Sequence, residues 1–246
     1  NSNSPIHPLM YNSVGGSTLH YTAHTPRFHP SDFRVKTLDK ISFDWPISYF
    51  DLEKYYDEND QIMNCSGLSG DPANPPRSER SLKPVPLGED GERIAKAFDR
   101  LNWHWWPSDN YVNSNNFKNN WKFYGSHALM DRESISSTDQ NYLPKAVKNG
   151  TKILTNCRVS KIVLDNSYKA KSVKYIKDGK ELELEGKNIV LASNAIGTPR
   201  ILFMSSTLGH ENGLGNSSGL LGKNLMFHPY AFIRGRFEGN NKFFLG

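Results

Sequence analysis

The strongest constraint on the fold is an Asp-Gly pair, Asp178-Gly179, which lies between two alternating runs at residues 172–176 and 182–184. Two strands joined by Asp-Gly form a tight antiparallel hairpin, because both residue types tolerate the positive φ angles of that turn. A further alternating run at residues 152–164 predicts another strand. The second half of the chain therefore contains a β-hairpin or meander.

An unbroken apolar run follows at residues 189–192 and leads through a short turn to Thr198-Pro199. Such a run is typical of a strand that is buried on both faces of a parallel sheet. Thr198 suits the N-cap of a helix and Pro199 its first position. A buried strand that leads into a helix N-terminus is the arrangement by which open α/β sheets bind nucleotides. The motif GxGxxG is absent from the chain, so the pattern does not name the nucleotide.

The first half of the chain predicts helices separated by long loops. Ser48 is a suitable cap for a helix over residues 50–62, and Asp90 for a helix whose apolar stripe is Ile94, Ala97, Phe98 and Leu101. A short helix at residues 142–148 ends at Asn149-Gly150. Residues 64–90 are rich in proline, glycine and serine and predict a surface loop. We therefore predict an α/β fold of mixed α+β character.

Composition excludes several classes of protein. The 246 residues carry a net charge of +5 with the basic residues scattered, which indicates a solvated surface and no nucleic-acid partner. No run of 18 apolar residues is present, so we expect no membrane span. Cys65 and Cys157 are too far apart for a CxxC motif, and core thiols or one disulfide both fit them. The compartment stays open between cytoplasmic and periplasmic or secreted.

A loop with two adjacent glycines, Gly15-Gly16, is the first candidate site. A backbone without side chains can approach an anion or a flat ring closely, and an ordinary turn fits the same residues. His20 and His24 also have metal-ligand spacing, but a glycine pair precedes them, Pro26 follows, and HExxH is absent, so we expect no metal. The aromatic cluster at residues 103–106 could stack a sugar, although packing at a helix end is the favoured interpretation.

Five segments resemble the glucose-methanol-choline (GMC) family of flavoprotein oxidoreductases. Residues 15–18 resemble the loop that closes over the flavin, and residues 44–56 resemble the segment DWPISYEDLEPYY. Residues 156–159 resemble a strand that contacts the adenine of FAD. Residues 191–200 resemble the pattern AGAIGSP, with Ser193-Asn194 in place of Ala-Gly, and residues 219–229 resemble GxNLxxH.

The resemblance implies FAD as the cofactor. His20 stands where some members bond covalently to FAD, and a noncovalent flavin contact is the alternative. Val159 would contact the adenine through its backbone, and Asn194 tolerates the left-handed geometry of its turn. The predicted cofactor-binding residues are Gly15, Gly16, Ser17, Thr18, His20, Val159, Asn194, Gly197 and Thr198.

The family is longer than this chain, so we expect an internal fragment that is inactive alone. The GxGxxG strand would precede Asn1, and the catalytic histidine with its partner histidine or asparagine would follow Gly246. His228 is then a structural or cofactor-proximal residue rather than the catalytic base. Residues 1–223 would form part of a Rossmann-like FAD-binding domain, with inserted loops at about 64–137, and residues 224–246 would begin the sheet of the substrate domain.

The implied function is oxidation of an alcohol, polyol, sugar or sugar acid by hydride transfer to flavin N5, followed by electron transfer to oxygen, a quinone or a cytochrome. One alternative is a noncatalytic carbohydrate-binding or scaffold protein on a degenerate flavoprotein fold. Another is a flavoenzyme of different chemistry, such as an amine oxidase or a hydroxylase, against which the segment at residues 44–56 argues.

Overall fold

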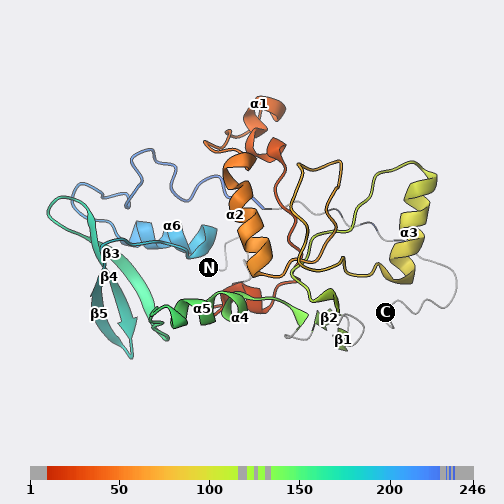
Figure 1. Cartoon of the computed structure of the whole chain (residues 1–246). Coiled ribbons are helices and arrows are strands. Elements are labelled where there is room, and N and C mark those ends of the chain that lie inside the picture. The colour runs from red at the N-terminus through yellow and green to blue at the C-terminus, as the bar shows by residue number, and fades with distance from the viewer. Residues whose placement is uncertain are drawn as a thin grey trace. The chain divides into compact units, whose positions relative to one another are not determined.

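The computed structural model describes residues 10–115, 121–124, 127–130 and 134–227, together with positions 231, 233 and 235. The chain forms two compact units, one within Asn1–Lys152 and one within Ile153–Arg234. The elements of the first unit are η1 (Gly16–Leu19), η2 (Pro30–Phe33), α1 (Val35–Asp39), α2 (Tyr49–Ile62), α3 (Gly88–Arg100), β1 (Trp121–Tyr124), β2 (His127–Met130), α4 (Thr138–Asn141) and α5 (Leu143–Lys148) (Figure 1). Those of the second are β3 (Arg158–Leu164), β4 (Ala170–Lys177), β5 (Lys180–Glu185) and α6 (Asn194–Met204).

Helix α2 confirms the prediction for residues 50–62. Asp51 accepts hydrogen bonds from the Ser48 N–H at 2.7 Å and from Ser48 Oγ at 2.8 Å, which satisfies donors at the helix start. Tyr49, the first helical residue, is completely buried and its ring lies 5.8 Å from the ring of Tyr56. The segment around residues 44–56 therefore packs aromatic side chains on a capped helix.

Helix α3 is also present, but it begins at Gly88, so Asp90 lies in its first turn and is not its cap. Its predicted apolar stripe is only partly covered, because Ile94 and Leu101 are exposed and Ala95 is the buried residue. The loop that precedes the helix contains no helix or regular strand, as predicted, and isolated bridges join Ser66 to Leu82 and to Asn110.

The region of inserted loops predicted at about 64–137 contains a short hairpin, in which β1 pairs antiparallel with β2. Helix α5 confirms the short helix predicted at 142–148. It ends where predicted, because Gly150 has φ +89° and its N–H donates to the Val147 carbonyl at 2.9 Å. Helix α4, immediately before it, had no signal of its own in the sequence analysis.

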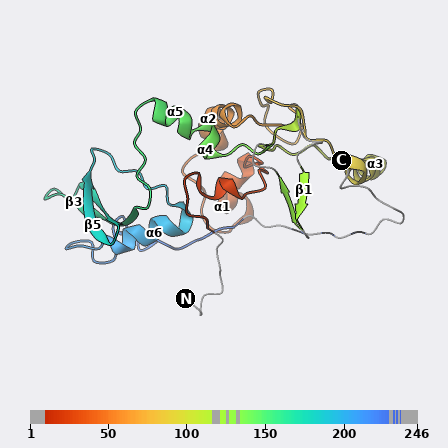
Figure 2. The ribbon, with the colours of Figure 1, turned by 90° about the horizontal axis from the view of Figure 1, so that it is seen from below.

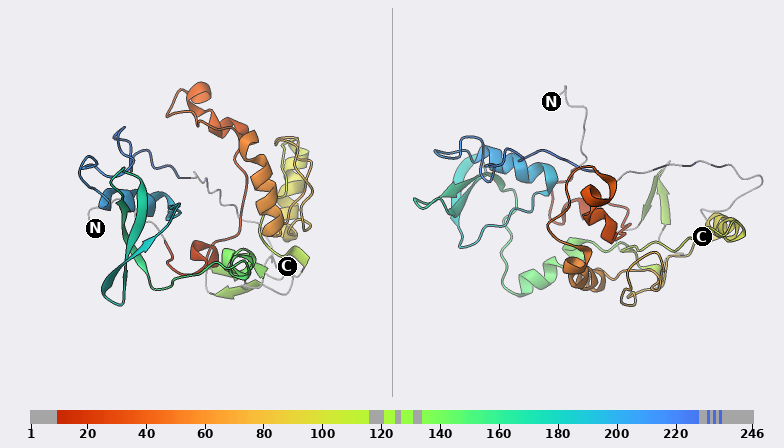
Figure 3. Two further views of the ribbon diagram at one scale, coloured as in Figure 1. Left: turned by 60° about the vertical axis from the view of Figure 1, so that its left-hand side comes forward. Right: turned by 90° about the horizontal axis from the view of Figure 1, so that it is seen from above.

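The second unit is built on an antiparallel sheet of order β3-β4-β5. Asp178 and Gly179 have φ angles of +50° and +74°, which confirms the predicted hairpin turn. Strand β3 begins only at Arg158 and not at residue 152, because Asn156 has a left-handed φ of +55° that interrupts an extended chain. Helix α6 packs on β3 (Figures 2 and 3). Ser205 Oγ, at the end of this helix, accepts the Ile162 N–H of β3 at 2.8 Å.

Two expectations about residues 189–199 are wrong. Residues 189–193 form no strand, and Val190 is 85% exposed. A strand is stabilised by a hydrogen-bonded neighbour, and no described segment pairs with this one. Helix α6 begins at Asn194, so Thr198 and Pro199 lie inside it rather than at its start.

The architecture is therefore a mixed helix and strand fold with a small three-stranded antiparallel sheet. The predicted boundary between residues 223 and 224 stays a prediction, because most of 224–246 lies outside the described residues. His228 lies outside them as well. Within the part of the chain that the structure describes, no helix has the length and apolar character needed to cross a membrane.

Candidate functional site

The glycine pair forms a tight turn that opens into η1. Gly15 has φ +94°, and a Cβ placed on it would lie 3.0 Å from Asp139 Cβ and 3.0 Å from Leu19 Cδ2. Gly16 has φ +56°, and a Cβ on it would meet nothing within 4 Å. Gly15 is therefore packed against its own unit, whereas the backbone at Gly16 faces open space.

Two hydroxyl groups hold this turn: one belongs to the turn itself, and the other to α4, which is far away in the sequence but in contact with the turn. Thr18 Oγ1 donates to the Gly15 carbonyl at 2.6 Å, and Thr138 Oγ1 donates to the same oxygen at 3.0 Å. The Thr138 N–H donates to Thr18 Oγ1 at 3.1 Å. Ser17, between these residues, is exposed. The loop is thus a defined structure and not a free turn.

His20 ends η1 with an exposed side chain. Its ring lies edge-on to Tyr11 with the ring centres 4.3 Å apart, and its imidazole makes no hydrogen bond to any described residue. His24 differs, because its Nε2 lies 2.5 Å from Ser108 Oγ. No group of three potential metal ligands occurs among the residues that the structure describes. His20 is therefore the histidine of this loop whose ring nitrogens are available for another partner.

A largely buried ionic cluster supports the segment that follows the loop. Its members are Arg27, Arg77, Arg80, Asp57, Asp60 and Asp109. Arg27 Nη2 donates to Asp60 at 2.5 Å and to Asp57 at 2.7 Å, and its guanidinium is almost fully buried. Arg80 forms a bidentate pair with Asp109 at 2.9 and 3.0 Å. Three positive and three negative side chains balance one another inside this unit.

The small apolar core lies beside the ionic cluster and consists of Ala23, Met63, Cys65, Tyr111 and Val112. Tyr111 donates its hydroxyl to Asp60 at 2.8 Å, and burial together with that carboxylate raises the pKa of Tyr111. Burial also raises the pKa of the Cys65 thiol to about 12. Cys65 and Cys157 are both free thiols, so the alternative of one disulfide is wrong.

Val159 lies on β3, which is one of the two edge strands of the sheet described in the second unit. The strand has a register shift between Val159 and Lys161, and Ser160 Oγ donates to the Lys174 carbonyl at 3.2 Å. An edge strand has backbone groups that its own sheet does not pair. The position of Val159 is therefore compatible with a backbone contact to a ligand.

Asn194, Gly197 and Thr198 come together at the start of α6. Asn194 has φ +63°, as its left-handed turn requires, and its Oδ1 accepts the N–H groups of Ile196 and Gly197 at 2.9 Å each. Thr198 Oγ1 accepts the Ser193 N–H at 3.2 Å. A Cβ on Gly197 would lie 3.1 Å from Ser193 Cβ. The side chains of Asn194 and Thr198 thus cap and shape this turn.

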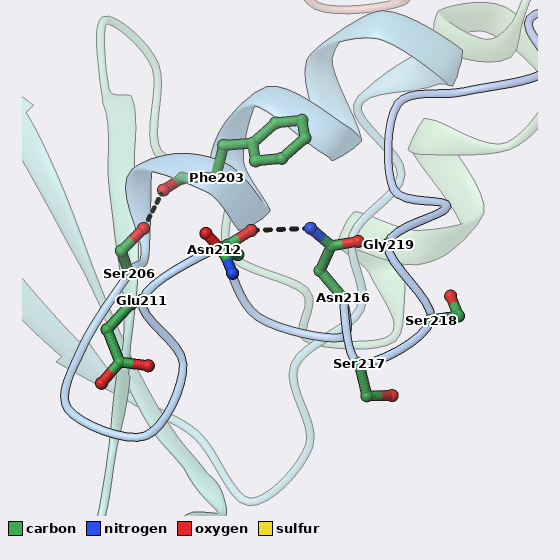
Figure 4. Close-up of a pocket in the computed structure, with 8 residues that line it drawn as sticks. All are labelled: Phe203, Ser206, Glu211, Asn212, Asn216, Ser217, Ser218 and Gly219. Carbon is green, nitrogen blue, oxygen red and sulfur yellow. Dashed lines mark hydrogen bonds between the residues drawn. The ribbon is translucent and has the colours of Figure 1, made fainter.

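One pocket of the second unit lies at the other end of α6. It has a volume of about 660 Å³ and is lined by Phe203, Ser206, Glu211, Asn212, Asn216, Ser217, Ser218 and Gly219 (Figure 4). Ser206 Oγ donates to the Phe203 carbonyl and Asn216 Nδ2 to the Asn212 carbonyl. None of the predicted cofactor-binding residues lines this pocket, so the pocket is not part of the predicted cofactor site.

The tryptophan cluster is held by its own unit. Trp106 Nε1 donates to the Leu68 carbonyl at 2.8 Å, and Trp105 Nε1 donates to Asp99 at 2.8 Å. The ring of Trp103 lies 5.5 Å from that of Phe98. These bonds favour the packing interpretation of the cluster.

Sequence reasoning missed Thr138, which contacts the glycine turn from α4. The two hydroxyls that meet at Gly15 belong to residues 120 positions apart, and a single sequence carries no signal for such a contact. The structure therefore places Gly15–His20 with Thr138 in the first unit, and Val159 with the turn at Asn194 in the second.

The sequence of the chain also matches the model of a known protein family. The sequence model described as GMC oxidoreductase matches residues 92–230, which is more than half of the chain. The chain belongs to the GMC oxidoreductase family. Members of this family depend in general on FAD.

Individual GMC relatives match nearly the whole chain. A 2-methyl-1,2-propanediol dehydrogenase of Mycolicibacterium austroafricanum is 40% identical over 90% of this chain and 41% of its own length. A fructose dehydrogenase large subunit of Gluconobacter japonicus is 28% identical over 88% of this chain and 41% of its own length. A 6'''-hydroxyparomomycin C oxidase of Streptomyces lividus is 23% identical over 95% of this chain and 44% of its own length. The chain thus spans about two fifths of the curated relatives it matches.

Proposed function

We propose that this chain is the flavin-contacting part of a longer GMC enzyme that oxidises a hydroxyl group of a small molecule. The observation that carries the proposal is the 40% identity over 90% of the chain to a diol dehydrogenase, together with the family match. The related proteins are named for a diol, a sugar and an aminoglycoside, which share the CH–OH group. The substrate class is accordingly an alcohol, polyol, sugar or sugar acid.

The geometry of the glycine turn is compatible with FAD. Gly16 has no side chain, and no described atom lies within 4 Å of the place that a Cβ would occupy. A flat ring therefore has room beside this backbone. His20 follows on the same short helix with an exposed imidazole. The second unit is considered by itself: there Val159 is proposed to contact the adenine through its backbone, and the capped turn at Asn194–Thr198 is a proposed cofactor contact.

Bound FAD supplies the acceptor for the hydride, which a protein side chain cannot provide. This chain would contribute orientation: the Gly15–Thr18 backbone limits where the ring system lies, and His20 provides either a contact or a covalent bond through one imidazole nitrogen. The general base that removes the hydroxyl proton is expected in the part of the enzyme beyond Gly246. Oxygen, a quinone or a cytochrome would serve as the final electron acceptor.

The covalent role of His20 is tested with the full-length enzyme. Acid precipitation of the wild type is expected to leave flavin on the tryptic peptide that contains His20, and His20→Ala is expected to release all flavin into the supernatant. His24→Ala is the matched control, because His24 lies on the same loop and is already hydrogen-bonded to Ser108. An unmodified His20 peptide from fully loaded wild-type enzyme would show that the flavin contact is noncovalent.

A further inference from the structure

The Gly15 carbonyl accepts hydrogen bonds from two threonine hydroxyls, whose residues are 120 positions apart in the sequence. Thr18 belongs to η1 and donates at 2.6 Å, and Thr138 begins α4 and donates at 3.0 Å. Thr138 also makes a second bond to the loop, because its N–H donates to Thr18 Oγ1 at 3.1 Å. One residue therefore fixes both the turn and the short helix that follows it.

Packing reinforces these hydrogen bonds. The place that a side chain would occupy at Gly15 is closed by Asp139, whose Cβ and Oδ1 lie 3.0 and 3.1 Å from an ideal Cβ. Asp139 is held by a hydrogen bond of 2.5 Å from Ser137 Oγ. The opposite situation holds at Gly16, where no described atom lies within 4 Å of such a Cβ. Helix α4 thus supports the side of the loop at Gly15 and leaves the backbone at Gly16 open.

We propose that Thr138 is a positioning residue for the flavin: its hydroxyl and N–H hold Gly15 and Thr18 so that the open backbone at Gly16 presents a fixed surface to the isoalloxazine ring. This inference rests on the proposed function, because it states which residue fixes the conformation of the proposed flavin-contacting loop. Thr138 does not touch the cofactor in this account. It acts through the loop, and it couples α4 to a site 120 residues earlier in the chain.

The chemistry of Thr138 suggests a graded set of variants. Thr138→Ser keeps the hydroxyl and the N–H, so it should retain both bonds. Thr138→Val keeps the branched shape and the N–H but loses the hydroxyl bond to Gly15. Thr155→Val is a matched control, because Thr155 is exposed and its hydroxyl has no described partner.

The test uses the full-length enzyme in a His20→Ala background, so that no covalent bond can retain the cofactor. FAD affinity is measured by titration of the stripped protein, and the visible circular dichroism of bound flavin reports how the ring is held. Thr138→Val is expected to bind FAD about fivefold more weakly than Thr138→Ser, the size expected for loss of one hydrogen bond. It is also expected to change the flavin dichroism, while Thr138→Ser and Thr155→Val match the background enzyme.

The outcomes separate this inference from the proposed function. Equal FAD affinity and equal dichroism in Thr138→Val and Thr138→Ser would overturn the positioning role while leaving the flavoenzyme intact. Weaker FAD binding by Thr138→Val with unchanged dichroism at saturating FAD would also overturn the positioning role. That result would mean that the substitution destabilises the protein without changing how the flavin ring is held. Failure of the background enzyme and the wild type to bind FAD at all would overturn the proposed function and the positioning role together.

Discussion

Replacement of Arg27 by methionine is expected to lower the free energy of unfolding by about 3–5 kcal/mol, the usual cost of removing one partner from a buried ionic network. The Arg27 side chain is 2% exposed and bonds to Asp57, Asp60 and Tyr49. Without the guanidinium, the buried Asp60 carboxylate loses its closest positive partner. Urea unfolding of the full-length protein, followed by tryptophan fluorescence, measures the effect.

Arg34→Met is the matched control for Arg27→Met. Arg34 pairs with Asp44 at 3.7 Å and its side chain is 55% exposed, so its loss should cost at most about 1 kcal/mol. Similar destabilisation by the two substitutions would contradict the assignment of Arg27 as a buried structural residue.

The pH dependence of the same variant gives a second readout. Burial raises the pKa of Asp57, but the hydrogen bonds from Arg27 and Ser78 outweigh it and hold the pKa below the ordinary 3.8. A carboxyl group with a lowered pKa in the folded state stabilises the fold above the unfolded pKa and loses that contribution as the pH falls through the folded one. We expect the wild type to lose stability below about pH 3.8, and Arg27→Met to lose less over the same interval.

Replacement of Gly15 by alanine is the second large expected effect, with a loss of about 3 kcal/mol in stability. Two causes combine: a non-glycine residue at φ +94° is strained, and the added methyl group meets Asp139 and Leu19 at 3.0 Å. The melting temperature of the protein without FAD is the measurement, because it separates stability from cofactor binding.

Gly16→Ala is the control for the glycine prediction. Its φ of +56° lies in the left-handed region, so some strain is expected, about 1 kcal/mol, but the new methyl group meets no described atom. A larger loss for Gly16→Ala than for Gly15→Ala would mean that the packing of the turn against α4 is not as described.

Local signals in the sequence were reliable where the structure depends on neighbouring residues. Helix α2 was predictable because Ser48 and Asp51 cap it within one turn. The hairpin between β4 and β5 was predictable because Asp178-Gly179 alone specifies the turn. The left-handed geometry of Asn194 followed from its residue type in the same way.

Predictions failed where two local signals competed or where a distant partner was needed. Thr198-Pro199 looks like a helix start, but Asn194 already accepts the N–H groups of the first turn and begins α6 earlier. The apolar run at residues 189–192 needs strands on both sides, which no local pattern supplies. The contact of Thr138 with Gly15 and the ionic cluster around Arg27 join residues far apart in sequence, so they became visible only in the structure.

The measurement that tests the central claim most directly is anaerobic titration of the purified full-length protein with alcohols, polyols and sugars while the visible flavin absorbance is recorded. We expect one flavin per polypeptide and loss of its oxidised absorbance with at least one hydroxylated substrate. A protein that holds no flavin would contradict the account and favour a noncatalytic carbohydrate-binding or scaffold role. A flavin that is reduced only by an amine would contradict oxidation of a CH–OH group.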